Sequence, residues 1–255
     1  MPVYRTIPPP HILSRSLDLF LRSEAGSDFQ SLLGLFPAAW KPVVMGGLLR
    51  DLLSQEILRV ARAPADVDIV IFGAASISQV RDILETAIRS TNAFGGFKCQ
   101  LRPHGIVFDL WRVEDHTNMA AAPCPHTIEQ LLQHNLLDID ALLWDPATNI
   151  LHDCGCQAAI QSERIDMMGP EGISRQFLAA QLAHVLVIAY KTNFSLSDKV
   201  REFIADASAK CPPLEIEQTL HRKHPQTASK IELFWNDLLA GGTPRCPDPT
   251  RAASL

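Results

Sequence analysis

The sequence predicts an α+β protein in which a mixed-sheet region, up to about residue 169, is followed by a small all-helical domain. Between residues 41 and 150, short β-branched runs alternate with helical patterns. After Gly169-Pro170 the apolar residues keep a helical spacing to about Leu239. The chain has 255 residues, of which 47% are hydrophobic. That is enough for a substantial core and excludes disorder as the main state.

The individual elements follow from local patterns along the chain. The strands are expected where short runs are rich in Val, Ile and aromatic residues, and the helices where apolar residues recur every three or four positions. The turn-like Pro103-His104-Gly105 joins two of the strands as a hairpin, and Pro146 marks a second turn. The expected strands are residues 42–45, 67–72, 96–102, 106–113, 139–144 and 149–153; the expected helices before residue 170 are 11–23, 28–36, 48–60 and 76–90.

We therefore expect four regions. An N-terminal helical extension spans residues 1–40, and the sheet region spans 41–169. The helical domain spans 170–240, with breaks at Pro212-Pro213 and near Pro225. Residues 241–255 hold three prolines and two glycines and are expected to be a flexible tail.

The charge balance limits the partners. The formal net charge is −5, divided into −6 over residues 1–169 and +1 over residues 170–255. Proteins that hold long nucleic acids non-specifically usually present a strongly basic face. Any grip on a nucleic acid must therefore be local, as on a strand end. The best local candidate is His221-Arg222-Lys223-His224, although such a run at a helix end more often complements the helix dipole.

Targeting and cysteine patterns favour a cytoplasmic protein without a membrane span. The longest apolar stretch, residues 177–190, is shorter than the ~20 residues that cross a bilayer. The N-terminus lacks the pattern of a secretory signal, and the six cysteines form no regular framework. His152, Cys154 and Cys156 alternate and could hold a metal on a strand, but their spacing is not typical of zinc sites. Buried free cysteines are the preferred interpretation.

The segment from Val43 to Asp51 is a strand that runs into a Gly-Gly turn and then into a helix opening with Arg50-Asp51. Two glycines, Gly46 and Gly47, let a phosphate approach the backbone, and the helix N-terminus offers free amides to an anion. Taken alone this is a weak signal, because Gly-Gly turns are common.

Three carboxylates strengthen the indication of a phosphate-binding site. Asp66 and Asp68 begin an apolar strand and, being two residues apart, share one face of it. Asp109 lies among apolar residues of the expected hairpin, where an unpaired charge is costly. Three carboxylates that converge on two metal ions are the usual arrangement for attack of a hydroxyl on phosphorus. An Asp-x-Asp by itself is more often a solvated strand end.

These residues together resemble a known family. The run Gly46-Gly47-x-x-Arg50-Asp51, Asp66-x-Asp68, and Asp109 followed by Arg112 resembles the head domain of the tRNA CCA-adding enzymes and bacterial poly(A) polymerases, in the DNA polymerase β nucleotidyltransferase superfamily. Residues 139–146 and 151–155 are similar to two further family segments, and in all the resemblance covers about residues 40–205.

The resemblance implies roles for particular residues. Asp66 and Asp68 would bind two magnesium ions, and Asp109 would complete the site and help to deprotonate the acceptor. Arg112 would contact the nucleotide or pair with Glu114 or Asp115. The residues implied to hold the nucleotide are Gly46, Gly47, Arg50 and Asp51.

The departures from the family pattern are equally informative. The motif whose Asp and Arg select the base falls on Phe177, Leu178 and Gln181, so its edge-reading charges are absent. Asp140 replaces an Asn, and 134–136 replace a charged triplet. His184 stands where the family has an Arg and is expected to be a core histidine rather than a base contact, as Trp111 and Trp144 are expected to be core. Residues 170–240 are also too short for the full tRNA-gripping domains, so housekeeping CCA repair is not expected.

The sequence thus predicts an enzyme that transfers a nucleoside monophosphate from a nucleoside triphosphate, ATP or CTP first, to a hydroxyl with release of pyrophosphate. The first choice of acceptor is a tRNA-like RNA 3′ end, and the nucleotide is expected between the sheet region and the helical domain. Two alternatives stay open. One is nucleotidylation of a protein or small molecule, which suits the acidic balance, and the other is a non-catalytic nucleotide- or RNA-binding module.

Overall fold

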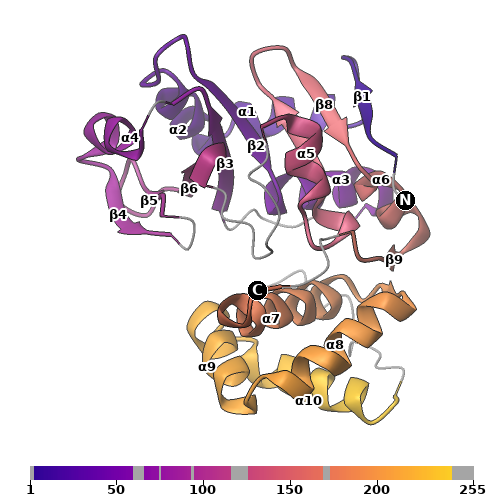
Figure 1. Cartoon of the computed structure of the whole chain (residues 1–255). Helices are drawn as coiled ribbons and strands as arrows, with labels where there is room; N and C mark the ends of the chain where they lie inside the picture. The colour runs from indigo at the N-terminus through magenta and orange to yellow at the C-terminus, as the bar shows by residue number, and fades with distance from the viewer. Residues whose placement is uncertain are drawn as a thin grey trace.

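A computed structural model describes residues 3–59, 66–74, 76–92, 95–115, 126–168 and 173–242. Figure 1 shows a sheet with flanking helices in the upper part and a group of helices beneath it. The sheet has the strand order β1-β8-β7-β2-β3-β6-β5-β4. Its strands are β1 (Arg5–Ile7), β2 (Lys41–Met45), β3 (Asp66–Phe72), β4 (Ile88–Thr91), β5 (Phe97–Cys99), β6 (Val107–Arg112), β7 (Leu142–Asp145) and β8 (Ile150–Asp153).

The sheet is mixed. The central pair β3 and β6 is parallel, and every other neighbouring pair in this sheet is antiparallel. The hairpin predicted around Pro103-His104-Gly105 is present as β5 and β6, and His104 takes a positive φ of 62° in its turn. Strands β9 (Arg164–Ile165) and β10 (Ser195–Leu196) form a separate small parallel pair.

The two faces of the sheet are covered unequally. Val67, Ile69 and Ile71 alternate along β3 and belong to the main core, together with apolar residues of the N-terminal helices. On the opposite face Val70 and Trp111 join a smaller cluster beneath one short helix, α5 (Ile128–Gln133). The helices on the main-core side are α1 (Ser14–Leu21), α2 (Glu24–Leu33), α3 (Gly47–Leu58) and α4 (Ile77–Leu84).

The lower part is helical, as predicted. Its long helix α7 is apolar around much of its surface, because it lies between the sheet region and the remaining helices. Pro213 occupies the first turn of α9, where its missing N–H costs nothing. The four helices are α7 (Arg175–Thr192), α8 (Asp198–Lys210), α9 (Pro213–Lys223) and α10 (Ala228–Leu239). Within the described ranges, no helix has both the length and the apolar character to cross a membrane.

Several boundaries differ from the sequence predictions. The helix expected over 76–90 ends at Leu84, because residues 88–91 pair with β5 as an edge strand. The strand expected over 139–144 begins with a turn of 3₁₀ helix at 138–140. Strand β1, helix α5 and helix α6 (Cys156–Ser162) were not predicted. Residues 60–65 and nearly all of the expected tail lie outside the described residues.

The cysteine and tryptophan expectations are confirmed for the described residues, while Cys124 and Cys246 lie outside them. Cys99, Cys154, Cys156 and Cys211 are free and buried. Cys154 and Cys156 do not share a strand, since Gly155 caps α6 and Cys156 opens that helix. Trp111 and Trp144 are buried core residues.

Candidate active site

The three predicted carboxylates lie on one face of the sheet. Asp66 and Asp68 are two apart on β3 and therefore point the same way. The parallel register places Asp109 of β6 directly beside Asp68. Helix α5 covers the other end of the same sheet face, where Val70 is buried. The strand pairing, which joins residues far apart in sequence, thus brings all three acidic side chains together.

Burial and mutual repulsion both act on the pKa values of Asp66 and Asp68. Desolvation, Asp66 and Asp109 together raise the pKa of Asp68 to about 8. The pKa of Asp66 is also raised, chiefly by desolvation and by Asp109, although Lys98 and Lys191 oppose the shift. Neither Asp66 nor Asp68 makes a side-chain hydrogen bond or ion pair with another described residue. The pair thus favours a bound cation, which would relieve this repulsion.

Asp109 is already engaged. Lys98 Nζ donates to Asp109 Oδ2 at 2.6 Å, and Asn92 Nδ2 donates to Oδ1 at 2.5 Å. Desolvation lowers the pKa of Lys98, but its hydrogen bond to Asp109 and the negative charges of Asp109, Asp66 and Asp68 together outweigh this and leave the pKa raised. Neither Lys98 nor Asn92 was predicted as a site residue. The signal that could have found Lys98 is the hairpin register, which sets it opposite Asp109.

The carboxylate oxygens of Asp66, Asp68 and Asp109 are suitable ligands for a divalent metal ion, provided that Asp109 is available. Carboxylate oxygens are the ligands that Mg²⁺ prefers, and Asp66 and Asp68 offer theirs without competition. Over the ranges that the structure describes, however, no group of three His, Cys, Asp or Glu side chains is arranged to hold an ion. Asp109 would complete such a group only if Lys98 moved away or shared its carboxylate.

The Gly-Gly turn lies beside these carboxylates. The antiparallel register pairs Met45 of β2 with Asp68, so the chain turns next to Asp68 as it leaves the strand. Gly46 has φ 74°, a conformation that L-residues rarely adopt, and a Cβ there would lie 2.8 Å from Asp68 Oδ2. Gly47 then begins α3, so the N-terminus of that helix directly follows the turn.

Gly46→Ala is expected to abolish function by displacing Asp68. Gly95 is the matched control, because it has the same φ of 74° but nothing lies within 4 Å of a Cβ at that position. Both substitutions should cost about 1–2 kcal/mol in backbone strain. Only Gly46→Ala should also lose the nucleotide transfer that the sequence predicts. Chemical denaturation alongside an activity assay separates the two effects. Equal activity loss in both variants would contradict this assignment.

Arg50, predicted to hold the nucleotide, is instead paired with a carboxylate of the protein. It is only 8% exposed and donates from Nη1 to Asp140 Oδ1. The other oxygen of Asp140 lies 2.8 Å from His184 Nε2 on α7. Desolvation would raise the pKa of Asp140, but Arg50 and His184 outweigh it and lower the pKa to about 2. Arg50, Asp140 and His184 therefore connect α3, the 3₁₀ turn and the helical part.

Contacts in the structure bear on two further sequence interpretations. His184 is not the core residue that was expected, because 42% of its side chain is exposed and its ring faces Asp140. Arg112 donates from Nε and Nη2 to Asp115, at 2.7 and 2.9 Å, and from Nη1 to the Ala74 carbonyl. Of its two proposed roles, these contacts support the structural one. Asp51 is partly buried, 3.4 Å from Arg50 Nε.

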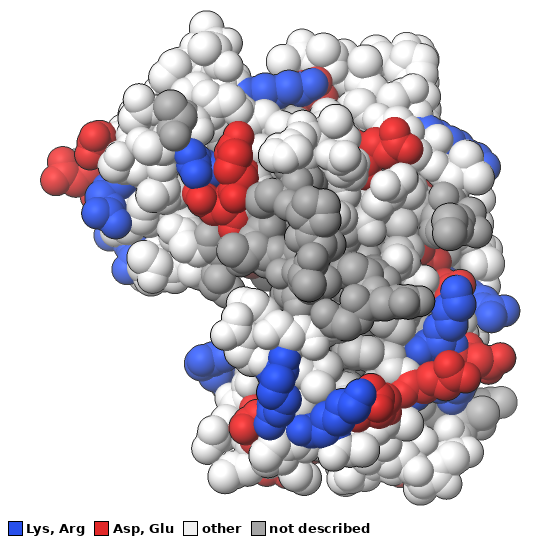
Figure 2. All heavy atoms as spheres, viewed as in Figure 1, with Lys and Arg blue, Asp and Glu red and all other residues white. Residues whose placement is uncertain are grey.

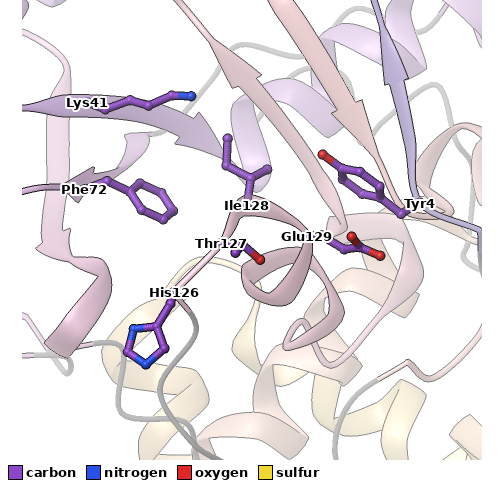
Figure 3. A pocket seen from close by; sticks show the side chains of 7 residues that line it. All are labelled: Tyr4, Lys41, Phe72, His126, Thr127, Ile128 and Glu129. Carbon is purple, nitrogen blue, oxygen red and sulfur yellow. The ribbon is translucent and has the colours of Figure 1, made fainter.

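A hollow of about 400 Å³ lies elsewhere on the same face of the sheet (Figure 3). Phe72 lines this hollow. It lies four residues beyond Asp68 on β3, which is roughly 13 Å along the strand from the Asp68 carboxylate. Its lysine, Lys41, is paired with Asp145 at 3.0 Å. The hollow is thus separate from the carboxylates. Its lining residues are Tyr4, Lys41, Phe72, His126, Thr127, Ile128 and Glu129.

Sequence comparisons find no counterpart: no protein-family model matches the chain, and no curated protein matches it. Solved structures do match. A Thermotoga maritima CCA-adding enzyme complexed with tRNA has a TM-score of 0.52 at 16% identity, over 92% of this chain and 55% of that one. A Bacillus stearothermophilus CCA-adding enzyme in complex with CTP has a TM-score of 0.58 at 16% identity, over 87% and 53%.

A third, a CCA-adding enzyme in complex with ATP, has a TM-score of 0.54 at 17% identity, over 92% of this chain and 55% of that one. The chain has the nucleotidyltransferase fold of the CCA-adding enzymes. The predicted α+β class, with a mixed-sheet head followed by helices, is confirmed. The chain spans a little over half the length of these structures.

Proposed function

We propose that this protein is a metal-dependent nucleotidyltransferase that moves a nucleoside monophosphate from a nucleoside triphosphate to a hydroxyl, with an RNA 3′ end as the acceptor. The observation that carries the proposal is the grouping of Asp66, Asp68 and Asp109 on one sheet face beside the Gly46-Gly47 turn. The shared fold with CCA-adding enzymes, whose structures include complexes with CTP, ATP and tRNA, supports it.

The residues divide the work as follows. The N-terminal amides of α3, opened by Gly46 and Gly47, receive the triphosphate. Asp66 and Asp68 would hold Mg²⁺, with Asp109 as a third ligand, and Asp109 is the group that accepts the proton of the attacking hydroxyl. Bound magnesium would lower the pKa of that hydroxyl and neutralise the pyrophosphate. Arg50 acts indirectly, by fixing Asp140 and the first turn of α3.

The reaction forms one P–O bond and breaks another. The acceptor oxygen bonds to the α-phosphorus while the bond from that phosphorus to the bridging oxygen breaks, and pyrophosphate leaves with the electron pair. The protein contributes by positioning, because it need form no covalent intermediate. ATP and CTP are the first nucleotides to test. We place the nucleotide between the head, residues 41–169, and the helical domain, residues 170–240.

The test is incubation of the purified protein with Mg²⁺, each α-labelled nucleoside triphosphate in turn, and a mixture of total RNA and cell lysate. An Asp66→Ala, Asp68→Ala variant is the control. We expect label in a defined RNA band that the variant does not produce. Variant-sensitive label in a protein or metabolite would instead identify nucleotidylation, the second candidate.

The Lys98–Asp109 ion pair favours one further candidate, a binding module without turnover, because it occupies the third carboxylate. Absence of variant-sensitive label with every nucleotide, together with retained nucleotide binding, would support that module and refute the enzyme.

A further inference from the structure

Asp109 differs from the two carboxylates beside it because both of its oxygens are occupied. Asn92 Nδ2 donates to Oδ1 at 2.5 Å, and Lys98 Nζ donates to Oδ2 at 2.6 Å. Figure 2 shows acidic atoms at the surface over β3 and β6, with basic atoms directly against them. A metal ion that uses Asp109 must therefore replace one of these two donors.

Asn92 is held on several sides. Its Nδ2 also donates to the Leu110 carbonyl at 3.0 Å, and its Oδ1 accepts from the backbone N–H of Gly96 at 2.8 Å. The turn that contains Gly96 lies so close to β6 that a Cβ there would be 2.0 Å from the Leu110 carbonyl oxygen. Asn92 is therefore a fixed donor, which orients the Asp109 carboxylate.

Lys98 is the donor that can leave. Its side chain is 40% exposed, whereas that of Asp109 is 15% exposed. Among the described residues, the bond to Asp109 is the only hydrogen bond of the Lys98 side chain. A partly exposed ion pair costs little to open, and a lysine ammonium on its flexible stem can move into solvent while β5 stays paired with β6.

The charges of the site determine how many ions it admits. The three carboxylates carry three negative charges when ionised, and Lys98 carries one positive charge, so their sum is −2. One divalent cation on Asp66 and Asp68 balances this sum with Lys98 in place. A second ion would be repelled by the first and by Lys98, and it would compete with Lys98 for Oδ2 of Asp109.

We propose that Lys98 competes with the second of two divalent cations for Asp109 and so makes completion of the metal site depend on the nucleotide. In the nucleotide-free protein, Lys98 holds Oδ2 and limits the site to one ion, on Asp66 and Asp68. The negative charge of a bound triphosphate favours a second ion, and Lys98 then releases Asp109 as a ligand and proton acceptor. Lys98 is thus a positioning residue. The inference rests on the proposed function and adds the order in which its site is assembled.

The test counts bound ions and does not depend on transfer. Mn²⁺ is titrated into the full chain without nucleotide, and the electron paramagnetic resonance signal of the free ion reports binding. We expect the parent to bind one ion. Lys98→Met should bind a second ion on the order of tenfold more tightly than the parent does, because a charge-assisted hydrogen bond no longer competes with that ion.

Two further variants control for charge. Lys98→Arg keeps the positive charge beside Asp109, and Lys230→Met removes the charge of an exposed lysine of α10. Both should bind one ion, as the parent does. Lys98→Gln is also neutral and should show the same gain as Lys98→Met, which keeps the comparison possible if the methionine variant does not fold.

The Asp109→Asn background separates competition from a general effect of charge. In that background Lys98→Met should not strengthen binding of a second ion, because the contested carboxylate is gone. An equal gain with and without Asp109 would show that Lys98 acts only through its field on Asp66 and Asp68, and would overturn the inference.

The dependence on the nucleotide is measured on a stoichiometric complex with a non-hydrolysable ATP analogue, in which the parent should bind a second ion. A parent that binds two ions without the analogue, or only one with it, would contradict the proposed order of assembly. Absence of nucleotide transfer, with these ion counts as expected, would refute only the proposed function.

Discussion

Asp68→Asn is expected to lose nucleotide transfer by at least about 10³-fold and at the same time to stabilise the protein. The loss follows because the amide cannot hold a divalent cation as a carboxylate does, and the transition state then loses its charge stabilisation. The gain in stability follows because desolvation and the neighbouring charges of Asp66 and Asp109 disfavour the charged form of Asp68, and the neutral amide avoids both costs.

The gain has a pH dependence with a definite sign. The pKa of Asp68 in the folded state is about 8, above its unfolded value of 3.8. The folded protein therefore binds more protons than the unfolded chain across this window, and stability falls as pH rises through it. Asp68→Asn removes this fall. Allowing for solvent at the site, the variant should be about 1–2 kcal/mol more stable at pH 8 and equal to the parent near pH 4.

Urea denaturation at the two pH values, with Asp82→Asn as the control, measures this effect. Asp82 is an exposed carboxylate of α4. Added Mg²⁺ should raise the melting temperature of the parent and of the control but not of Asp68→Asn. A variant less stable than its parent at pH 8 would contradict the repulsion on which the site is built.

The second large effect is on folding. Asp140→Ala is expected to lower the free energy of unfolding by about 3–5 kcal/mol, because it leaves the Arg50 guanidinium buried without its main counter-charge. His184 would lose its partner as well, but it is more exposed and its contribution should be below about 1 kcal/mol. The contribution of Asp140 should persist from neutral pH to about pH 4 and vanish as pH falls through about 2, since its folded pKa is lowered.

A double-mutant cycle with Arg50→Met isolates this pair. If the cost of Asp140→Ala is the unpaired charge, then Arg50→Met, Asp140→Ala should be more stable than the sum of the single variants implies, by about 2 kcal/mol. Chemical denaturation at pH 7 measures the free energy of unfolding of the parent, the two single variants and the double variant. Strict additivity would mean that the two side chains do not interact, contrary to their contact in the fold.

Local patterns in the sequence were sufficient for the parts of the site that lie on one element. Asp66 and Asp68 share a face because strand side chains alternate, and Gly46-Gly47 between a strand and a helix indicates a tight turn. Asp109 could be predicted because an unpaired carboxylate among apolar residues is energetically costly and therefore indicates a function. Each of these inferences depends on neighbours a few residues away.

The remaining features depend on pairings that local patterns do not contain. The Lys98–Asp109 contact follows from the hairpin register, and the Arg50–Asp140–His184 connection joins three elements that are distant in sequence. The helix expected over 76–90 was wrong in its second half because an edge strand at 88–91 overrides the local propensity.

The central claim, that Asp66, Asp68 and Asp109 form a metal site for nucleotidyl transfer, is tested most directly by anomalous diffraction from crystals grown with Mn²⁺ and a non-hydrolysable nucleoside triphosphate analogue. The account predicts manganese bound to Asp66 and Asp68, the triphosphate at the Gly46-Gly47 turn, and Lys98 displaced from Asp109. Manganese found elsewhere or not at all, with Lys98 still bound to Asp109, would contradict it.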